Sequence, residues 1–270
     1  MPVVKQAFFI KESRGKMRAL VTGASSGIGK EMAIYLASKK IDLILAARRK
    51  ENLEILKKEL ETTYGIHVEV YPCDLIDLKA CYQLFEQFPK IDILINNAGF
   101  GDAGEFIKTD LDKELAMIDL NIKAMHILCK KYAQIFVEQK SGYILNVASL
   151  AAFQAGPKMA TYYATKAYVL HLSEALNYEL KKAKHPVSVT ALCPGPVETE
   201  FNQVANVKFH MKELSAKKVA QIGIDAMFKK KTIVIPGIKG KLGVFFERFI
   251  SRKLSNKIIC RVQEKKQNGK

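Results

Sequence analysis

The 270-residue chain lacks an apolar run that approaches the roughly 18 residues of a membrane-spanning helix. The apolar pieces before Lys16 are short and interrupted, so no signal peptide is predicted, and we expect a cytoplasmic protein. The chain also lacks internal repeats, low-complexity tracts and a Pro/Gly-rich linker that would mark a second domain. A single globular domain with a large core is therefore predicted.

Cysteine and histidine patterns typical of disulfide frameworks and metal sites are missing as well. The five cysteines are odd in number, scattered, and never in Cys-x-x-Cys spacing, which excludes an obvious disulfide set or zinc site. None of the five histidines has a partner at metal-ligand or catalytic-triad spacing. A reducing compartment and a protein without a metal centre are expected.

Acidic residues are scarce, with 27 Asp and Glu against 43 Lys and Arg, a net charge of +16. Half of that excess lies between Gly237 and Lys270, where ten basic residues accompany two glutamates. Such a segment could contact an acidic partner, a membrane surface or a phosphorylated substrate, or could simply be a solvated basic face. No nucleic-acid-binding motif accompanies the charge, so we expect no nucleic-acid partner.

Short β-branched runs alternate with helical patterns along the chain, which is typical of a parallel sheet covered by helices on both faces. We predict an α/β fold of the Rossmann type, a single-domain, doubly wound, seven-stranded parallel sheet. The predicted strands are Ala19 to Thr22, Leu43 to Ala46, Val68 to Tyr71, Ile91 to Ile95, Tyr143 to Val147, Val187 to Cys193 and Thr232 to Ile235. Two long helices are predicted, over Leu111 to Gln139 and Thr161 to Lys182.

Three regions follow from this pattern. Residues 1–16 precede the first strand and form an extension with no expected function, and either Met1 or Met17 could be the natural start. Residues 17–236 form the predicted dinucleotide-binding catalytic domain. Residues 237–270 form a basic, amphipathic C-terminal tail.

A glycine-rich turn follows the first predicted strand and opens a helix, which is the setting of a dinucleotide-binding turn. Glycine permits the tight turn and the close approach of a pyrophosphate, whose charge is favoured at the helix N-terminus. The spacing is Gly-x-x-x-Gly-x-Gly, and on its own it is a weak signal. The candidate cofactor-binding residues here are Thr22, Gly23, Ser25, Ser26, Gly27, Ile28 and Gly29.

The end of the second predicted strand indicates which dinucleotide is bound. It carries Arg48 and Arg49 and lacks the carboxylate that would bind a ribose 2′-hydroxyl of NAD. Arginine suits a 2′-phosphate because its planar fork of donors can grip phosphate oxygens. NADP(H) is therefore the expected cofactor; the alternative is that both arginines only begin a solvated helix.

A candidate proton donor lies further along the chain. Tyr162 and Lys166 are one helical turn apart and share a helix face, so the ammonium can approach the phenol. A nearby cation favours the phenolate, and we expect Lys166 to lower the pKa of Tyr162. Ser149, at the end of a predicted strand, can bind a substrate carbonyl and stabilise charge that develops on it.

The chain also contains, in order, Cys73-Asp74-Leu75, Asn96-Asn97-Ala98-Gly99, Asn121 and Pro194-Gly195-Pro196-Val197-x-Thr199. With the motifs above, these resemble the short-chain dehydrogenase/reductase family, in particular NADP-dependent 3-oxoacyl or hydroxysteroid carbonyl reductases. The resemblance runs from about Met17 to Ile235. It implies a catalytic set of Asn121, Ser149, Tyr162 and Lys166, with Asn121 ordering a water that links Lys166 to solvent. It also implies that Asp74 binds the adenine amino group. The cofactor-binding residues implied beyond the turn are Arg48, Arg49, Asp74, Leu75, Asn97, Ala98, Gly99, Tyr162, Lys166, Pro194, Gly195, Val197 and Thr199.

Apolar residues near the expected nicotinamide position predict a pocket for a sizeable ketone. They come from Phe100-Gly101, Ala151 to Met159 and Glu200 to Met211, and the last segment is a plausible lid. The candidate substrate-binding residues are Ser149, Tyr162, Phe100, Phe153 and Phe201, with Met159, Val204, Phe209 and Met211 nearby.

The function predicted from sequence is an NADP(H)-dependent oxidoreductase that interconverts a small-molecule ketone and a secondary alcohol. The alternative is an NADP(H)-binding sensor that acts through a protein partner. A homodimer or homotetramer is expected from the resemblance. For the tail, with apolar residues at helical spacing among Lys and Arg, we favour capping the pocket or covering a subunit's core over peripheral contact with an anionic membrane.

Overall fold

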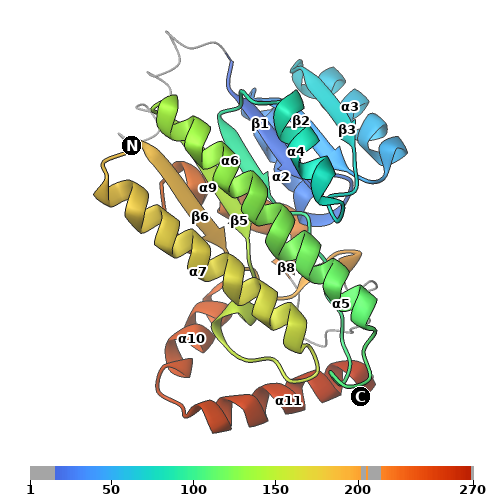
Figure 1. Cartoon of the computed structure of the whole chain (residues 1–270), viewed down its shortest axis with the longest axis vertical. Coiled ribbons are helices and arrows are strands. Elements are labelled where there is room, and N and C mark those ends of the chain that lie inside the picture. Colours follow the sequence, from blue (N-terminus) through green and yellow to red (C-terminus); the bar gives the residue numbers. More distant parts are fainter. Residues whose placement is uncertain (1–15, 202–204, 206–213, 269–270) are drawn as a thin grey trace.

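The computed structural model of the chain describes residues 16–201, 205 and 214–268. Its centre is a seven-stranded parallel sheet in the order β3-β2-β1-β4-β5-β6-β9 (Figure 1). The strands are β1 (Arg18–Thr22), β2 (Asp42–Ala47), β3 (Val68–Pro72), β4 (Ile93–Asn96), β5 (Gly142–Val147), β6 (Val187–Leu192) and β9 (Ile233–Val234). The strand order reverses between β1 and β4, so the predicted doubly wound sheet is confirmed.

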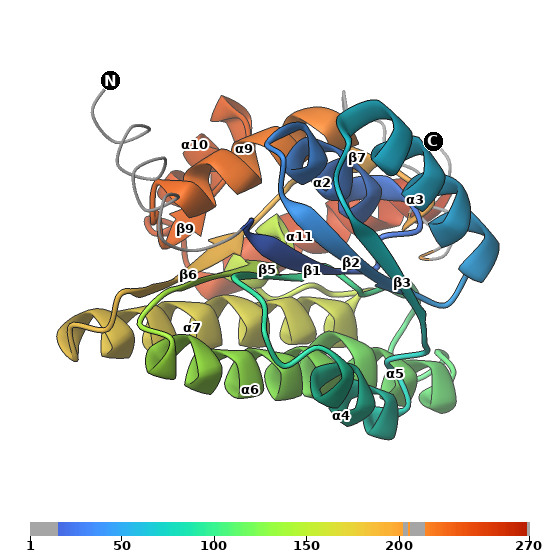
Figure 2. The same ribbon diagram turned by 90° about the horizontal axis from the view of Figure 1, so that it is seen from above.

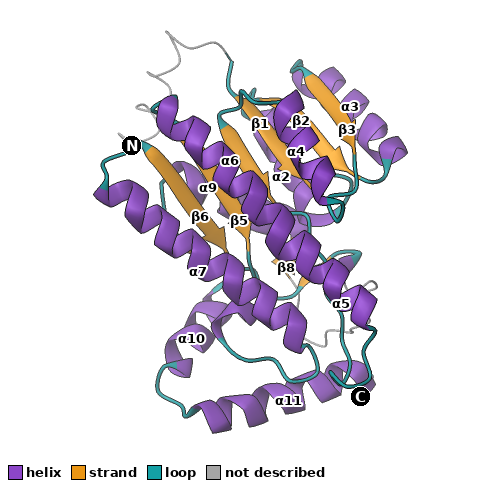
Figure 3. Cartoon of the chain, in the orientation of Figure 1, coloured by secondary structure: helices purple, strands orange, loops and turns teal. Residues whose placement is uncertain are grey.

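Helices cover both faces of this sheet, as the view from above shows (Figure 2). One face carries α2 (Gly27–Ser38), α3 (Lys50–Tyr64) and α9 (Ala216–Phe228). The other carries α4 (Leu78–Gln87), α5 (Leu111–Ile118), α6 (Met125–Glu138) and α7 (Ala160–Lys182). Two further helices, α10 (Ile238–Glu247) and α11 (Arg252–Asn268), follow the last strand and lie beyond the carboxyl ends of the strands (Figure 3).

The core has one layer on each face because strand side chains alternate between faces. In β2, Leu43 and Leu45 pack with α2 and α3, while Ile44 and Ala46 pack against residues of α4 and α6. Both sets are fully buried or nearly so. A sheet covered in this way needs apolar residues at consecutive positions, which explains the short β-branched runs in the sequence.

The helix predicted over Leu111 to Gln139 has an interruption. A π-helical turn, η2 (Asp119–Ala124), separates α5 from α6 and contains Asn121. Such turns are frequent at functional sites because the extra residue redirects side chains. A second small sheet, absent from the prediction, pairs β7 (Val197–Glu198) with β8 (Leu214–Ser215). A single 3-10 turn, η3 (Leu150–Phe153), follows β5.

No helix in the described part of the chain is long and apolar enough to cross a membrane. The predicted extension over residues 1–16 falls, apart from Lys16, outside the described residues.

Candidate active site

A cavity of about 570 Å³ opens at the carboxyl ends of the central strands, where the strand order reverses. Open α/β sheets bind ligands at this edge. The glycine-rich turn, the ends of β2, β4 and β5, the start of α7, the segment after β6 and one residue of α11 all line the cavity. Most residues predicted from sequence therefore lie around one space.

The glycine-rich turn has the backbone that its sequence predicts. Gly23 and Gly27 have φ angles of +66° and +56°, in the left-handed region that favours glycine. A Cβ at Gly29 would lie 2.3 Å from the Gly23 carbonyl oxygen and 2.4 Å from Asn97 Nδ2, so only glycine fits. The turn leads into α2 at Ser26, whose helix N-terminus faces the cavity. This cradle fits the pyrophosphate of a dinucleotide.

Two of the predicted turn residues lie behind the cavity wall. Thr22 is buried, and its hydroxyl accepts hydrogen bonds from the backbone N–H groups of Asn97 and Ala98 at 3.0 and 3.1 Å. Asn97 Nδ2 donates to the Thr22 and Gly23 carbonyls at 3.0 and 3.2 Å. Thr22 and Gly29 thus shape the turn, whereas Gly23, Ser25, Ser26, Gly27 and Ile28 line the cavity.

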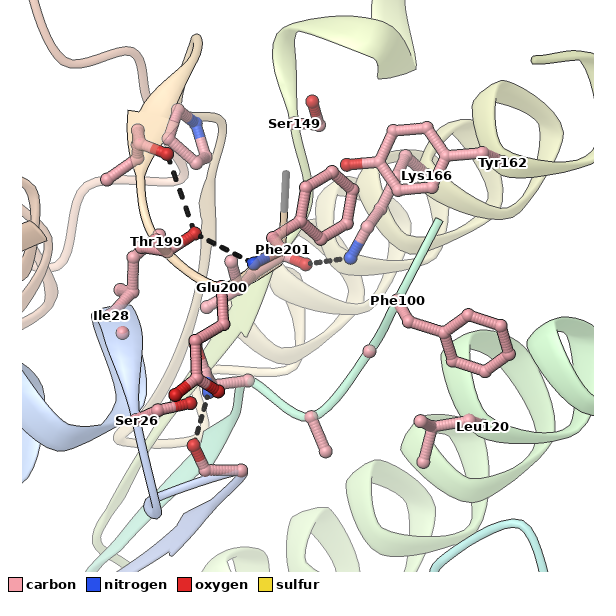
Figure 4. Close-up of a pocket in the computed structure, with 18 of the residues that line it drawn as sticks. Ser26, Ile28, Phe100, Leu120, Ser149, Tyr162, Lys166, Thr199, Glu200 and Phe201 are labelled. Carbon is pink, nitrogen blue, oxygen red and sulfur yellow. Dashed lines mark hydrogen bonds between the residues drawn. The ribbon is translucent and has the colours of Figure 1, made fainter. Parts of the chain in front are cut away.

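The arginines after β2 also line the cavity. Arg49 donates to Ser25 Oγ at 3.2 Å and forms an ion pair with Glu200 at 2.8 Å. Arg49 and the Ser26 hydroxyl lower the pKa of Glu200 by hydrogen bonding, so Glu200 is ionised. Glu200 points to the Ser26 side of the cavity in the close-up view (Figure 4). The Glu200 carboxylate therefore pairs with Arg49, a donor of the kind that would bind a 2′-phosphate.

The adenine end predicted from the resemblance lies beside these arginines. Asp74 and Leu75 line the cavity, as do Asn97, Ala98 and Gly99 from the segment after β4. Asp74 Oδ1 accepts the backbone N–H of Ile76 at 3.0 Å, which holds the carboxylate at the end of β3. The side chains present therefore fit a dinucleotide along its whole expected length.

Ser149 and Tyr162 meet at the other end of the cavity. Ser149 follows β5, and its Oγ accepts the N–H of Ala151 at 3.1 Å, which fixes the hydroxyl at the start of η3. The Tyr162 hydroxyl points toward Ser149 in Figure 4. The Lys166 ammonium donates to the Val147 carbonyl at 2.9 Å and lies 5.9 Å from the Tyr162 ring centroid.

The predicted lowering of the Tyr162 pKa by Lys166 is wrong for this arrangement. Burial raises the pKa of Tyr162 to about 12, against a smaller lowering by the Ser149 hydrogen bond. Burial also lowers the pKa of Lys166 to about 8, because the charged ammonium loses its hydration. The phenol is therefore held in its protonated form at neutral pH.

Asn121 lies just behind the cavity, in the π-helical turn. Its side chain accepts the Phe100 N–H at 3.1 Å and donates to the Phe100 carbonyl at 2.9 Å and to Thr165 Oγ1 at 3.1 Å. A Cβ at Gly99 would lie 2.8 Å from Asn121 Oδ1 and 3.5 Å from Lys166 Nζ. Both polar groups therefore face the same small space beside Gly99.

Pro194, Gly195, Val197 and Thr199 line the cavity after β6, as predicted for the nicotinamide end. Thr199 Oγ1 accepts the N–H of Phe201 at 3.3 Å. The Phe201 ring lies beside Tyr162, with ring centroids 5.4 Å apart (Figure 4). This segment therefore connects the glycine-rich turn side of the cavity with Tyr162.

The predicted substrate residues divide into two groups. Phe100, Phe201 and Met159 line the cavity, but Phe153 does not, because η3 turns its ring into the core on the α6 and α7 side. The predicted lid over Glu200 to Met211, with Val204, Phe209 and Met211, lies largely outside the described residues.

Sequence reasoning missed Tyr163 and Gln263, which line the cavity on the side of Tyr162. Gln263, in α11, is 1% exposed, and its Nε2 donates to the Tyr163 hydroxyl at 2.5 Å. Ser255, Ile259 and Gln263 recur every fourth residue on the inward face of α11. The signal available in the sequence was Gln263, a polar residue on the same helical stripe as Ile259. The tail thus caps the pocket, one of the three arrangements that the sequence left open.

No group of three or more His, Cys, Asp or Glu side chains that could hold a metal ion occurs in the described part of the chain. The chemistry available is instead a buried phenol, a hydroxyl and an ammonium at one end of a dinucleotide cradle. That fold and that site define a nicotinamide-dependent oxidoreductase.

Comparison with known proteins agrees with this class. The family model described as short chain dehydrogenase matches residues 17–208. The chain therefore belongs to the short-chain dehydrogenase family, whose enzymes bind a nicotinamide cofactor and act on small molecules.

Individual relatives cover most of the chain. It is 34% identical over 231 residues to an NADP-dependent 3-hydroxy acid dehydrogenase of Schizosaccharomyces pombe, covering 80% of this chain and 88% of that protein. A short-chain dehydrogenase from Sphingobium yanoikuyae, solved in complex with NADPH, is 30% identical with a TM-score of 0.78, covering 86% and 93% of the two chains. A bulky-bulky ketone specific alcohol dehydrogenase from Comamonas testosteroni is 27% identical with a TM-score of 0.76, covering 87% and 93%.

Proposed function

We propose that this enzyme is an NADP(H)-dependent carbonyl reductase that interconverts a sizeable apolar ketone and its secondary alcohol, with Tyr162 as general acid and base. The observation that carries the proposal is the buried Tyr162 phenol, which points toward Ser149 and is held protonated at the end of the dinucleotide cradle. A protonated donor beside a carbonyl is what ketone reduction needs.

In the proposed reaction the nicotinamide, when bound, supplies a hydride to the carbonyl carbon. Ser149 donates a hydrogen bond to the carbonyl oxygen and stabilises its developing negative charge. Tyr162 transfers its phenolic proton to that oxygen, which completes the alcohol. In the oxidation direction the phenolate takes the alcohol proton back.

Lys166 and Asn121 are proposed to restore the proton on Tyr162. Both groups face the small space beside Gly99, where a water could contact each of them. The Lys166 ammonium lies on the same helix face as Tyr162 and is buried, so its proton is exchanged through this space and not directly with bulk solvent. We also propose that Lys166 holds the nicotinamide ribose hydroxyls.

The preference for NADP(H) over NAD(H) is supported by Arg48 and Arg49 at the cavity wall and by the missing carboxylate after β2. The Schizosaccharomyces pombe relative is NADP-dependent by name, and the Sphingobium structure contains NADPH. Glu200 would have to release Arg49 for a 2′-phosphate to pair with it. The remaining cofactor residues proposed are those that line the cavity from Gly23 to Thr199.

A sizeable apolar substrate is supported by Phe100, Met159 and Phe201, which line the cavity. Hydroxysteroids and 3-oxoacyl thioesters are the two classes we propose to test first. Gln263 and Tyr163 place a polar patch on the cavity wall next to Tyr162, which a substrate would face.

We further propose a homodimer or homotetramer formed through α5, α6 and α7. These helices present large apolar side chains to solvent, among them Leu111, Leu115 and Tyr178. A cytoplasmic location is proposed from the five free cysteines, which suit a reducing compartment. The alternative function, a sensor that binds NADP(H) and signals through a partner, has no observation in its favour.

The test is absorbance of NADPH, with NADH in parallel, during incubation with ketosteroids, 3-oxoacyl thioesters and simple diketones. We expect oxidation of NADPH, at least about tenfold faster than that of NADH, with one of the first two classes. Tight NADPH binding without turnover of any compound would favour the sensor.

A further inference from the structure

The outer surface of the C-terminal tail carries a set of large apolar side chains that the fold leaves in contact with solvent. Helix α10 has no buried residue, and Phe245, Phe246 and Phe249 are 53%, 60% and 72% exposed. Phe245 packs edge-on against Phe246 and Phe249, with ring centroids 5.5 and 5.4 Å apart. We call the tail surface the exposed set Ile238, Leu242, Phe245, Phe246, Phe249, Ile250, Leu254, Ile258 and Val262. Exposed apolar groups at this density mark an interaction site.

Helix α11 separates its residues into three neighbouring stripes, each with a four-residue spacing. The inward stripe contains Ser255, Ile259 and Gln263, which pack toward the pocket. The next stripe, one position earlier, consists of the exposed apolar residues Leu254, Ile258 and Val262. The third stripe, one position earlier again, consists of the basic residues Lys253, Lys257 and Arg261. Successive positions on a helix are about 100° apart, so the apolar stripe lies between the pocket and the basic stripe.

The basic side chains beside the tail surface are free to bind an anion. The described ones are Lys239, Lys241, Arg248, Arg252, Lys253, Lys257 and Arg261. Among the described residues, none of these seven side chains forms an ion pair. The two glutamates of the segment have donors of their own, since Glu247 accepts from Ser255 Oγ at 2.7 Å and Glu264 from the Cys260 thiol at 3.6 Å.

We propose that the tail surface docks on an anionic phospholipid bilayer, with its phenylalanines in the interface and its basic residues against the lipid phosphates. Aromatic and aliphatic side chains flanked by Lys and Arg are the composition of helices that lie in a membrane interface. The tail lies on the bilayer and does not span it, in keeping with the absence of a membrane-crossing helix among the described residues.

Charge argues against a second copy of the chain as the occupant. A symmetric pair would bring the basic residues of both copies into one interface, which like-charge repulsion opposes. An anionic bilayer instead meets the same residues with opposite charge. Because Gln263 of the same helix lines the pocket, docking would place the part of the cavity around Gln263 close to the lipid surface.

The experiment is flotation of the full-length protein with vesicles of phosphatidylcholine alone and with the same vesicles containing phosphatidylglycerol. We expect binding to the anionic vesicles that weakens at high salt, and little binding to the neutral ones. Phe245→Ser with Phe249→Ser should lower the partition coefficient at least about tenfold. Lys253→Gln, Lys257→Gln and Arg261→Gln together should lower it about a hundredfold.

Two matched variants control for general effects. Phe106→Ser with Ile107→Ser removes exposed apolar groups elsewhere, and Lys58→Gln, Lys130→Gln and Lys182→Gln together remove the same charge from α3, α6 and α7. Both should bind anionic vesicles like the wild type. An unchanged melting temperature shows that each variant is folded.

The proposal is overturned if the wild type does not float with anionic vesicles, or if the two control variants lose as much binding as the tail variants. It is also overturned if the tail phenylalanine variant floats normally. A wild-type dimer by light scattering that becomes monomeric in that variant, without vesicle binding, would identify a second copy as the occupant. Flotation requires no turnover, so its outcome is independent of the proposed reaction.

Discussion

The carboxyl edge of the sheet and the C-terminal tail both line one cavity, and they differ in which kind of side chain is buried and which is exposed. At the sheet edge, polar side chains are buried: Asn121 is 2% exposed and makes three hydrogen bonds. In the tail, apolar groups are exposed, and α10 buries none of its residues. Burial at the edge fixes the protonation state of Tyr162 and Lys166, whereas exposure in the tail leaves surface for a partner.

The largest expected effect of this difference in burial is on the free energy of unfolding. Phe136 in α6 is fully buried, and Phe136→Ala is expected to lower the free energy of unfolding by about 3–5 kcal/mol through the cavity that it leaves. The same change at the exposed Phe245 should alter it by no more than about 0.5 kcal/mol. Urea denaturation of both variants measures this. A loss of comparable size at Phe245 would mean that the tail is part of the core.

The preference for NADPH over NADH should depend on the two arginines at the carboxyl edge of the sheet and not on surface charge in general. Arg48→Gln with Arg49→Gln is expected to weaken NADPH binding about 10- to 100-fold, because charge-assisted hydrogen bonds to the 2′-phosphate are lost. NADH binding should stay nearly unchanged. The matched control is Lys57→Gln with Lys58→Gln on α3, which removes the same charge. Titration by nucleotide fluorescence distinguishes the variants, and equal weakening of NADPH and NADH would contradict the assignment.

The rate of ketone reduction should depend on pH through Lys166. Its pKa is lowered to about 8, so the ammonium is present below that pH and is lost as the pH rises through it. Tyr162, with a pKa of about 12, stays protonated over the same range. With saturating NADPH, kcat should be flat up to about pH 8 and then fall by about tenfold per pH unit. A kcat that stays flat well above pH 8 would contradict this role of Lys166.

The features predictable from the sequence were those that local backbone chemistry demands. Glycines with positive φ at positions 23 and 27, and the tight space at Gly29, leave a recognisable spacing. The strands were predictable because a sheet covered on both faces requires continuous apolar runs. The Tyr162 to Lys166 spacing likewise follows from helix geometry.

The features that were missed depend on tertiary packing. Desolvation reversed the expected pKa shift of Tyr162, and burial of this kind is not visible in a spacing. A 3-10 turn directs Phe153 into the core, although Leu150 and Ala151 of the same turn line the cavity. Gln263 reaches the site only because α11 folds back across it, some hundred residues after Tyr163 in the chain. The π-helical turn at Asn121 adds one residue per turn, which helical periodicity over a long segment does not reveal.

The most direct test of the account compares Tyr162→Phe with wild type, measuring kcat for ketone reduction and the dissociation constant for NADPH on the same samples. Tyr178→Phe, an exposed tyrosine on the same helix, is the matched control. The account predicts that Tyr162→Phe lowers kcat by about 10²- to 10⁴-fold while NADPH binding changes little and the control behaves as wild type. Retained turnover in Tyr162→Phe would contradict the assignment of Tyr162 as the proton donor.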